Sequence, residues 1–243
     1  MKRIGLAVLL AATCPNGRSS CRPIAVQLPT ANLGIALGTF DTVAFNGQVR
    51  WESSGTSNYK LRLANGSLGS PGLVTGGSPI TWNSNAPQTF SMSFGGTTAA
   101  LSVVDGPSTY TINANPANTA VNGLLIGIRT NGSSSITLSD LRVDGVSLNI
   151  GSISLAKVSS QSFLYVSNVF APFTLSGLIQ MARTGGGSGA EVPAMQIYAG
   201  YAEVPEPATF AMVGFLLLAL AMGWRKFELG SARVVIRRER DRC

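Results

Sequence analysis

Short runs in which apolar and polar residues alternate fill the centre of the chain, from about residue 24 to residue 200. In one of these runs, Phe90, Met92 and Phe94 alternate with Ser91 and Ser93. Successive side chains of a strand point to opposite faces, so this period of two predicts a β-strand with one buried and one solvated face.

A second run contains a slip in the alternation. Ile136 and Leu138 alternate with polar residues, the phase shifts by one residue at Ser139-Asp140, and Leu141 resumes the pattern. One extra residue in a strand is what a β-bulge introduces. We therefore expect a single strand with a bulge here.

Other apolar residues that are spaced by an even number of positions predict further strands. Turn residues separate these runs. The apolar sets are Leu124, Ile126 and Ile128, and Phe173, Leu175, Ile179 and Met181. The turn signals are Asn65-Gly66-Ser67, Gly76-Gly77-Ser78-Pro79, Asp105-Gly106-Pro107, Asn131-Gly132-Ser133 and Asp144-Gly145. Many short strands of this kind are typical of a sandwich or barrel.

The predicted fold is therefore all-β: an antiparallel, jelly-roll-like β-sandwich over residues 24–203, followed by a single transmembrane helix. Two facing sheets each bury one alternating face, and we expect the Ser/Thr/Asn face to stay in water. Gly185-Gly186-Gly187-Ser188-Gly189 is interpreted as a hairpin loop between strands at 173–183 and 192–201, with a flexible linker as the alternative.

The C-terminal region has a different pattern. Val204-Pro205-Glu206-Pro207 cannot lie inside a regular helix, and an uncharged apolar run over residues 208–224 follows it. A helix of that length, about 26 Å, is just long enough to cross a bilayer core. Arg225 and Lys226 then act as a membrane stop on the cytoplasmic side, which places the upstream chain outside. A buried core helix is the alternative.

This order of motif, apolar helix and basic cluster resembles the PEP-CTERM sorting signal of Gram-negative bacteria over residues 204–226. The resemblance implies that the protein is exported and that an exosortase-type enzyme processes it. In that case Val204, Pro205, Glu206 and Pro207 form the recognition element. Residues 227–243 depart from the family pattern, and they are interpreted as a basic cytoplasmic tail or as an artefact of the gene model.

The N-terminal region supports export. Lys2 and Arg3 precede an apolar stretch from Ile4 to Ala12, as in a secretory signal peptide, so residues 1–23 are assigned to the signal and its processing region. No clean cleavage site follows. Cys14 opens a lipoprotein alternative, but the three residues before it lack the expected pattern.

The net charge of +7 belongs to the two ends of the chain. Residues 1–23 and 225–243 carry +4 each, and the residues between them carry −1. Nucleic-acid binding needs a basic face on the folded part, so we expect no nucleic-acid partner. The Arg-rich tail, which follows the predicted membrane helix, is better interpreted as a segment that faces anionic lipid than as a nucleic-acid-binding segment.

Few residues offer catalytic or metal chemistry. The chain has no His, which excludes His-based catalysis and His metal ligands, and its three Cys lie outside the central region. We predict no metal, no cofactor and no enzyme activity. Carboxylates leave a glycosidase-like pair open as an alternative, at Asp41, Glu52, Asp105, Asp140, Asp144 and Glu191.

Two further alternatives concern ligands. Trp51 and Trp82 either fill the core, which we favour, or stack on sugars from an exposed face. Asp105, Asp140 and Asp144 suggest a calcium site, although Asp144-Gly145 fits a hairpin turn better. The predicted function is that of an exported, non-enzymatic surface or matrix protein, structural or adhesive, in an exopolysaccharide context. A carbohydrate-binding module is the first alternative and a polysaccharide hydrolase the second.

Overall fold

The structure of the chain is a computed structural model. It describes residues 22–30, 32–51, 60–66, 72–76, 82, 85–131, 133–156, 160–183 and 193–202. All of them belong to one compact unit that spans residues 16–203.

The predicted N-terminal signal and the C-terminal sorting region lie outside the described residues. This applies to Val204, Pro205, Glu206 and Pro207, to the apolar run 208–224, and to Arg225 and Lys226. Within the described part of the chain, no helix has the length and apolar character needed to cross a bilayer.

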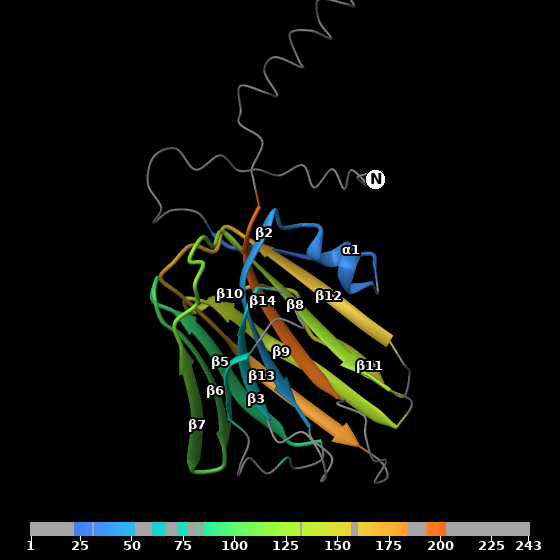
Figure 1. Cartoon of the computed structure of the whole chain (residues 1–243). Helices are drawn as coiled ribbons and strands as arrows, with labels where there is room; N and C mark the ends of the chain where they lie inside the picture. Colours follow the sequence, from blue (N-terminus) through green and yellow to red (C-terminus); the bar gives the residue numbers. More distant parts are fainter. Residues whose placement is uncertain are drawn as a thin grey trace, which may run out of the picture. The chain divides into compact units, whose positions relative to one another are not determined.

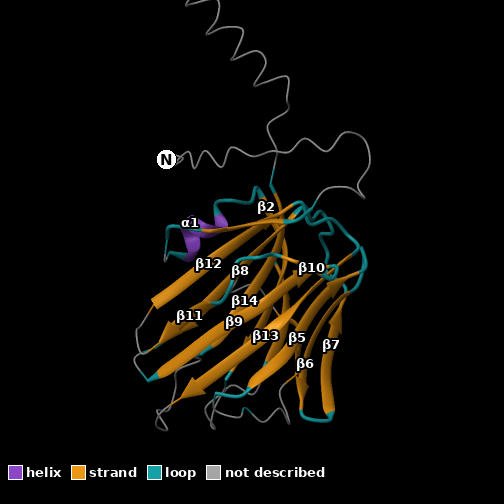
Figure 2. Ribbon diagram, turned by 180° about the vertical axis from the view of Figure 1, so that it is seen from behind, coloured by secondary structure: helices purple, strands orange, loops and turns teal. Residues whose placement is uncertain are grey.

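Two antiparallel sheets make up the described unit (Figures 1 and 2). The first, which we call sheet A, has the order β1-β12-β8-β14-β2-β3-β4. Its strands are β1 (Ile24–Gln27), β12 (Ser160–Ser167), β8 (Gly123–Thr130), β14 (Ala194–Tyr201), β2 (Thr42–Arg50), β3 (Leu61–Asn65) and β4 (Gly72–Gly76). This confirms the all-β prediction.

The second sheet, sheet B, has the order β10-β9-β13-β5-β6-β7, and β11 also pairs with β9. Its strands are β10 (Val146–Ser147), β9 (Ser134–Val143), β13 (Phe173–Arg183), β5 (Pro87–Phe94), β6 (Ala99–Asp105), β7 (Ser108–Ala114) and β11 (Ile153–Ala156).

The strand pairs are nested along the chain. β2 pairs with β14 and β8 pairs with β12 in sheet A, while β5 pairs with β13 and β9 pairs with β11 in sheet B. Each inner pair lies between the two strands of the next outer pair in the sequence. The chain therefore folds back on itself as one long hairpin whose pairs alternate between the two sheets.

The main core lies between the sheets. Both contribute their alternating apolar residues to one buried cluster, for example Phe45 from β2 and Phe94 from β5, whose ring centroids are 4.9 Å apart. The apolar residues that the sequence places at every second position of β8 and β13 are all buried in this cluster. This confirms the strand period that the sequence predicts for these segments.

The predicted bulge is also present. Between β9 and β13, Ser176 pairs with Arg142 and Leu178 pairs with Ser139, so Asp140 and Leu141 together lie opposite Gly177. Asp140 has a φ of 49°, and burial resumes at Leu141. The phase slip in the sequence therefore marks the extra residue, as expected.

One expectation is wrong for sheet A, whose second face is not left in water. β14 is buried at every position from Ala194 to Gly200, including Gln196 and Tyr198 on the face away from sheet B. Part of this face is covered by α1 (Leu33–Leu37), a short helix that the alternation did not predict, and by neighbouring residues. They form a smaller second cluster of buried residues: Leu28, Ala36, Phe40, Leu125, Phe163 and Tyr198.

A glycine makes room for this second cluster. A Cβ on Gly127 of β8 would approach Cε1 of Phe163 to 2.8 Å, closer than side chains tolerate. The absence of a side chain at Gly127 thus lets the Phe163 ring pack against the sheet. The strands of sheet A are apolar in both phases, as at Leu124 and Leu125, because both of their faces are buried.

The segment around residues 185–189 does not connect the two strands of a hairpin. This corrects the interpretation of the glycine run as a hairpin loop between strands at 173–183 and 192–201. β13 belongs to sheet B, where it pairs with β5 and β9, whereas β14 belongs to sheet A, where it pairs with β2 and β8. The connection therefore crosses from one sheet to the other. Strand periodicity does not reveal which strands pair, so the two choices look alike in the sequence. The glycine run itself lies outside the described residues.

The start of β1, the first described strand, and the end of β14, the last one, lie in the same row of paired residues across sheet A. Ile24 of β1 pairs with Ser167 of β12. Ser167 in turn pairs with Gly123 of β8, and Gly123 pairs with Gly200 of β14. Residue 22 and residue 202 therefore leave the sheet at the same end, only a few strand spacings apart.

Candidate functional site

The outer face of sheet B carries mainly hydroxyl side chains, and we call it the hydroxyl face. Its members alternate with buried core residues and are half-buried or exposed. They are Thr89, Ser91 and Ser93 of β5, Ser102 of β6, Thr109 and Thr111 of β7, Ser135, Thr137 and Ser139 of β9, Ser154 of β11, and Thr174 and Ser176 of β13.

These hydroxyls are aligned across the strands. Thr111, Ser102, Ser91 and Ser176 lie in register on four neighbouring strands. Neighbours in such a row are about 4.8 Å apart, and same-face residues along one strand are about 6.8 Å apart. The result is a regular grid of groups that both donate and accept hydrogen bonds.

Some of the hydroxyls bond to each other. Ser102 Oγ and Thr111 Oγ1 are 2.8 Å apart, and Thr137 Oγ1 and Ser154 Oγ are also 2.8 Å apart. Each of these hydroxyls keeps further lone pairs for a ligand or for water. Outward-pointing Val104 and Leu178 interrupt the grid, and none of the side chains described on this face is aromatic.

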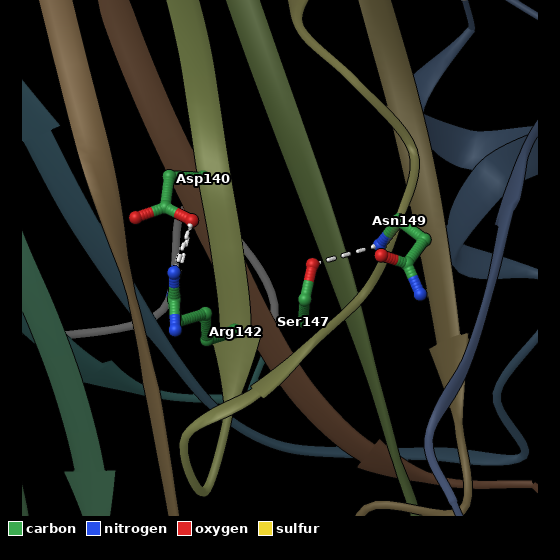
Figure 3. A network of polar contacts seen from close by, with 4 residues as sticks. All are labelled: Asp140, Arg142, Ser147 and Asn149. Atoms are coloured by element: carbon green, nitrogen blue, oxygen red, sulfur yellow. Dashed lines mark hydrogen bonds and ion pairs between the residues drawn. The ribbon is translucent and has the colours of Figure 1, made fainter.

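Charge on this face is confined to one margin. Arg142 forms an ion pair with Asp140, with 2.9 Å between Nη2 and Oδ1, and its Nε also donates to Oδ1 at 3.0 Å. Figure 3 shows this pair on β9, with Ser147 and Asn149 of the following segment beside it; the Asn149 backbone N–H donates to Ser147 Oγ at 3.2 Å. Asp144, in the turn after β9, adds one carboxylate at the same margin, and the other described side chains of the face are uncharged.

Two of the carboxylates considered for catalysis or metal binding, Asp140 and Asp144, hydrogen-bond to other residues of sheet B. Asp144 and Gly145 have positive φ and form the β9–β10 turn, as the sequence predicts. Asp144 Oδ1 accepts the Thr174 N–H at 2.7 Å, which ties this turn to β13. Asp105 closes the β6–β7 turn on another part of sheet B.

The described residues contain no group of three or more acidic, His or Cys side chains that could hold a metal ion. In sheet B, β13 and β5 separate the strands that carry Asp105 and Asp140. The suggested calcium site is therefore not assembled by this fold. Glu52 and Glu191 lie outside the described residues.

Both candidate stacking tryptophans pack against the main core. Trp51 and Trp82 are partly buried there, and the Trp82 indole N–H donates to the Arg50 carbonyl oxygen at 3.0 Å. The two residues therefore contact the core, as the core interpretation expects, but they do not fill it. Tyr201, at 40% exposure, is one of the few large apolar side chains exposed in the described residues.

A second polar group lies on the covered face of sheet A. Arg62, Gln48 and Gln196 are in register there, and the buried Tyr198 hydroxyl donates to Gln196 Oε1 at 3.0 Å. Burial raises the pKa of Tyr198 well above its usual range, and the charges of Arg129 and Arg62 lower it only in part. Gln48, Gln196 and Tyr198 are almost fully inaccessible, so they offer no surface to a ligand.

The alternation in the sequence identifies several residues of the hydroxyl face, including Ser91, Ser93 and Thr137. It does not identify the grid, because the rows depend on which strands pair and in which register. The predicted site residues at 204–207 and 225–226 lie outside the described residues and stay predictions.

Comparison with known proteins adds no family to these observations. No protein-family model matches the chain. No curated protein matches it either.

Proposed function

We propose that this chain is an exported, non-enzymatic surface or extracellular-matrix protein of the PEP-CTERM type, with a structural or adhesive role among exopolysaccharides. The observation that carries the proposal is the order of Val204-Pro205-Glu206-Pro207, the apolar run 208–224 and Arg225-Lys226 directly after the last strand of the β domain. In this account an exosortase-type enzyme recognises the motif, and the run 208–224 holds the chain in the membrane until processing.

The position of the strand ends supports this account. Residue 22 and residue 202 leave sheet A at the same end, next to Gly123. A signal peptide before β1 and a sorting tail after β14 are therefore attached to the same end of the domain.

The finer fold that we propose is a jelly roll followed by one membrane-spanning helix at 208–224. The nested pairs β2–β14, β5–β13, β8–β12 and β9–β11, split alternately between two sheets, support the jelly roll. In this scheme β3 and β4 extend sheet A, and β6 and β7 extend sheet B.

Cell fractionation tests the sorting proposal. We expect the full chain in the surface or matrix fraction, and we expect the triple variant Pro205→Ala, Glu206→Ala, Pro207→Ala to remain in the membrane fraction. A Ser93→Ala variant is the control, since it changes the domain and leaves the tail intact. Equal distribution of the triple variant and the wild type would contradict the proposal.

The hydroxyl face favours a second function, binding of a neutral exopolysaccharide. Its neutral grid of donors and acceptors matches the chemistry of uncharged sugar hydroxyls, and it binds without the stacking that exposed tryptophans would provide. The partner is therefore recognised by many weak hydrogen bonds over a long polymer, a multivalent mode.

Co-sedimentation of the full chain with a neutral, insoluble polysaccharide tests this function. The variants Ser91→Glu and Ser176→Glu place a charge in the centre of the grid, and we expect each to reduce the bound fraction. Gln27→Glu on β1 is the matched control, because it adds the same charge to an exposed position of sheet A. The hydroxyl face would be rejected as the binding surface if the control lost binding as much as the two serine variants. It would also be rejected if neither serine variant lost binding.

A further inference from the structure

We propose that β7 is a self-association edge, through which two copies of the chain pair antiparallel and join their sheets B into one continuous sheet. β7 is the last strand in the order of sheet B, and it lies at the border of the sheet in both views (Figures 1 and 2). This proposal stands apart from the sorting proposal, because it concerns the domain and not the tail.

The register of the β6–β7 hairpin determines which backbone groups face outward. Asp105 and Ser108 close a two-residue turn, so this pair exchanges hydrogen bonds within the hairpin. Hydrogen-bonded and non-hydrogen-bonded pairs alternate along an antiparallel ladder. Thr109, Thr111 and Asn113 therefore direct their N–H and C=O groups away from β6, and no described strand pairs with them.

The side chains of β7 also indicate an incomplete surface. Tyr110 and Ile112 point toward the main core and pack against it, yet they are only half-buried. On the outer side, Thr109, Thr111 and Asn113 are exposed. A strand added beside β7 would increase the burial of the two apolar side chains and pair with the outward backbone groups of Thr109, Thr111 and Asn113.

β7 lacks the features by which edge strands avoid association. Charged residues, prolines and bulges protect such edges, but β7 reads Ser-Thr-Tyr-Thr-Ile-Asn-Ala and pairs with β6 in unbroken register. Other described edges are shorter. β10 has 2 residues, β1 and β11 have 4 residues each and β4 has 5, against 7 in β7.

The strand is complementary to a second copy of itself. In an antiparallel pair centred on Thr111, each Thr111 faces its counterpart, and Thr109 faces Asn113 of the other copy. These are the residues whose backbone groups point outward, so the hydrogen-bonding positions coincide. On the inner side Tyr110 faces Ile112 of the other copy, an aromatic and β-branched pair of the stabilising kind. No like charges meet, because the strand is uncharged.

This pairing brings the hydroxyl faces of the two copies onto the same side of one sheet. Thr111 and Ser102 of each copy would then continue a single row of hydroxyls across the joint. A repetitive ligand would meet twice the grid, which raises avidity without a new type of contact.

Cysteine cross-linking of the full chain, extracted in mild detergent, tests the proposal. In the pair centred on Thr111, the two Thr111 Cα atoms are about 5.5 Å apart, within the range of a disulfide. After oxidation with copper phenanthroline, we expect Thr111→Cys to give a disulfide-linked dimer. Thr174→Cys is the control, since it is exposed on the same face but lies on β13. The wild-type chain gives the background from its own three Cys.

A second variant separates backbone pairing from side-chain contact. Thr109→Pro, added to Thr111→Cys, removes an outward N–H that takes no part in the β6 ladder, whereas Thr109→Val keeps it. We expect Pro to lower the dimer yield about tenfold or more and Val to leave it close to that of Thr111→Cys alone. The proposal is overturned if Thr111→Cys cross-links no better than Thr174→Cys, a comparison that needs no proline variant.

Discussion

Gly177 of β13 lies directly against Leu141, the residue at which β9 resumes its pattern after the bulge. A Cβ on Gly177 would come within 2.7 Å of Leu141 Cδ2, and within 3.1 Å of both Phe90 Cε1 and the Ser139 carbonyl oxygen. The extra residue in β9 thus pushes a leucine side chain into the space that a side chain on β13 would need.

Replacing Gly177 by Ala should therefore destabilise the domain. Overpacking of a well-filled core costs about 1–3 kcal/mol, and we expect a loss of unfolding free energy in that range, measured by urea denaturation. Gly95→Ala is the control, because its Cβ would have only the Thr98 carbonyl oxygen within reach, at 4.0 Å. Equal stability of the two variants would show that β9 can shift to make room.

The alternation of apolar residues predicts this bulge and the strands around it, because β5, β9 and β13 each have one buried and one more exposed face. It failed at sheet A, where Tyr198 and Gln196 are buried on the second face and α1 adds a layer. The pairing of β13 with β5 could not be predicted from the alternation either, since it depends on contacts between residues far apart in the chain. The hydroxyl grid depends on this pairing, and the open edge at β7 depends on the strand order of sheet B.

The stability of the domain should fall in strong alkali because of Tyr198. Burial raises the pKa of this phenol in the folded state above the ordinary value of 10.0, so the folded state keeps its proton where the unfolded chain loses it. The stabilising contribution is complete below pH 10 and decreases as the pH rises beyond that value. We expect Tyr198→Phe to flatten this decline, measured as the unfolding midpoint against pH from 8 to 12. An unchanged slope would mean that other groups, such as the half-buried Tyr165, dominate the decline.

The second cluster on sheet A should contribute measurably to stability. Phe163 is buried in the same cluster as Phe40 and Ala36 of α1, and removal of a buried phenylalanine side chain costs about 3–5 kcal/mol. We expect Phe163→Ala to lower the unfolding free energy by that amount in chemical denaturation. The exposed Phe170 provides the control, since Phe170→Ala should change it by less than about 0.5 kcal/mol. A small effect at Phe163 would show that the cluster is not closely packed.

Asn122 should hold the last strand in place just before the tail. Its Nδ2 donates to the Ala202 carbonyl oxygen at 2.6 Å, and its Oδ1 accepts the Ala202 N–H at 2.9 Å. We expect Asn122→Ala to accelerate hydrogen exchange at the Ala202 amide, with little change at Ile197 in the middle of β14. Asn118→Ala, which loses only a local bond to Ala120, should leave both rates unchanged. Unchanged exchange at Ala202 in the Asn122 variant would contradict this role.

The central claim, that the tail beginning at Val204-Pro205-Glu206-Pro207 is a sorting signal, is tested most directly by the intact mass of the mature protein. The measurement compares protein from cells with and without the exosortase-type enzyme. We predict a mass that lacks the apolar run 208–224 and the basic residues after it when the enzyme is present, and the complete tail when it is absent. An intact tail in both strains would contradict the claim and leave residues 208–224 as a plain membrane anchor.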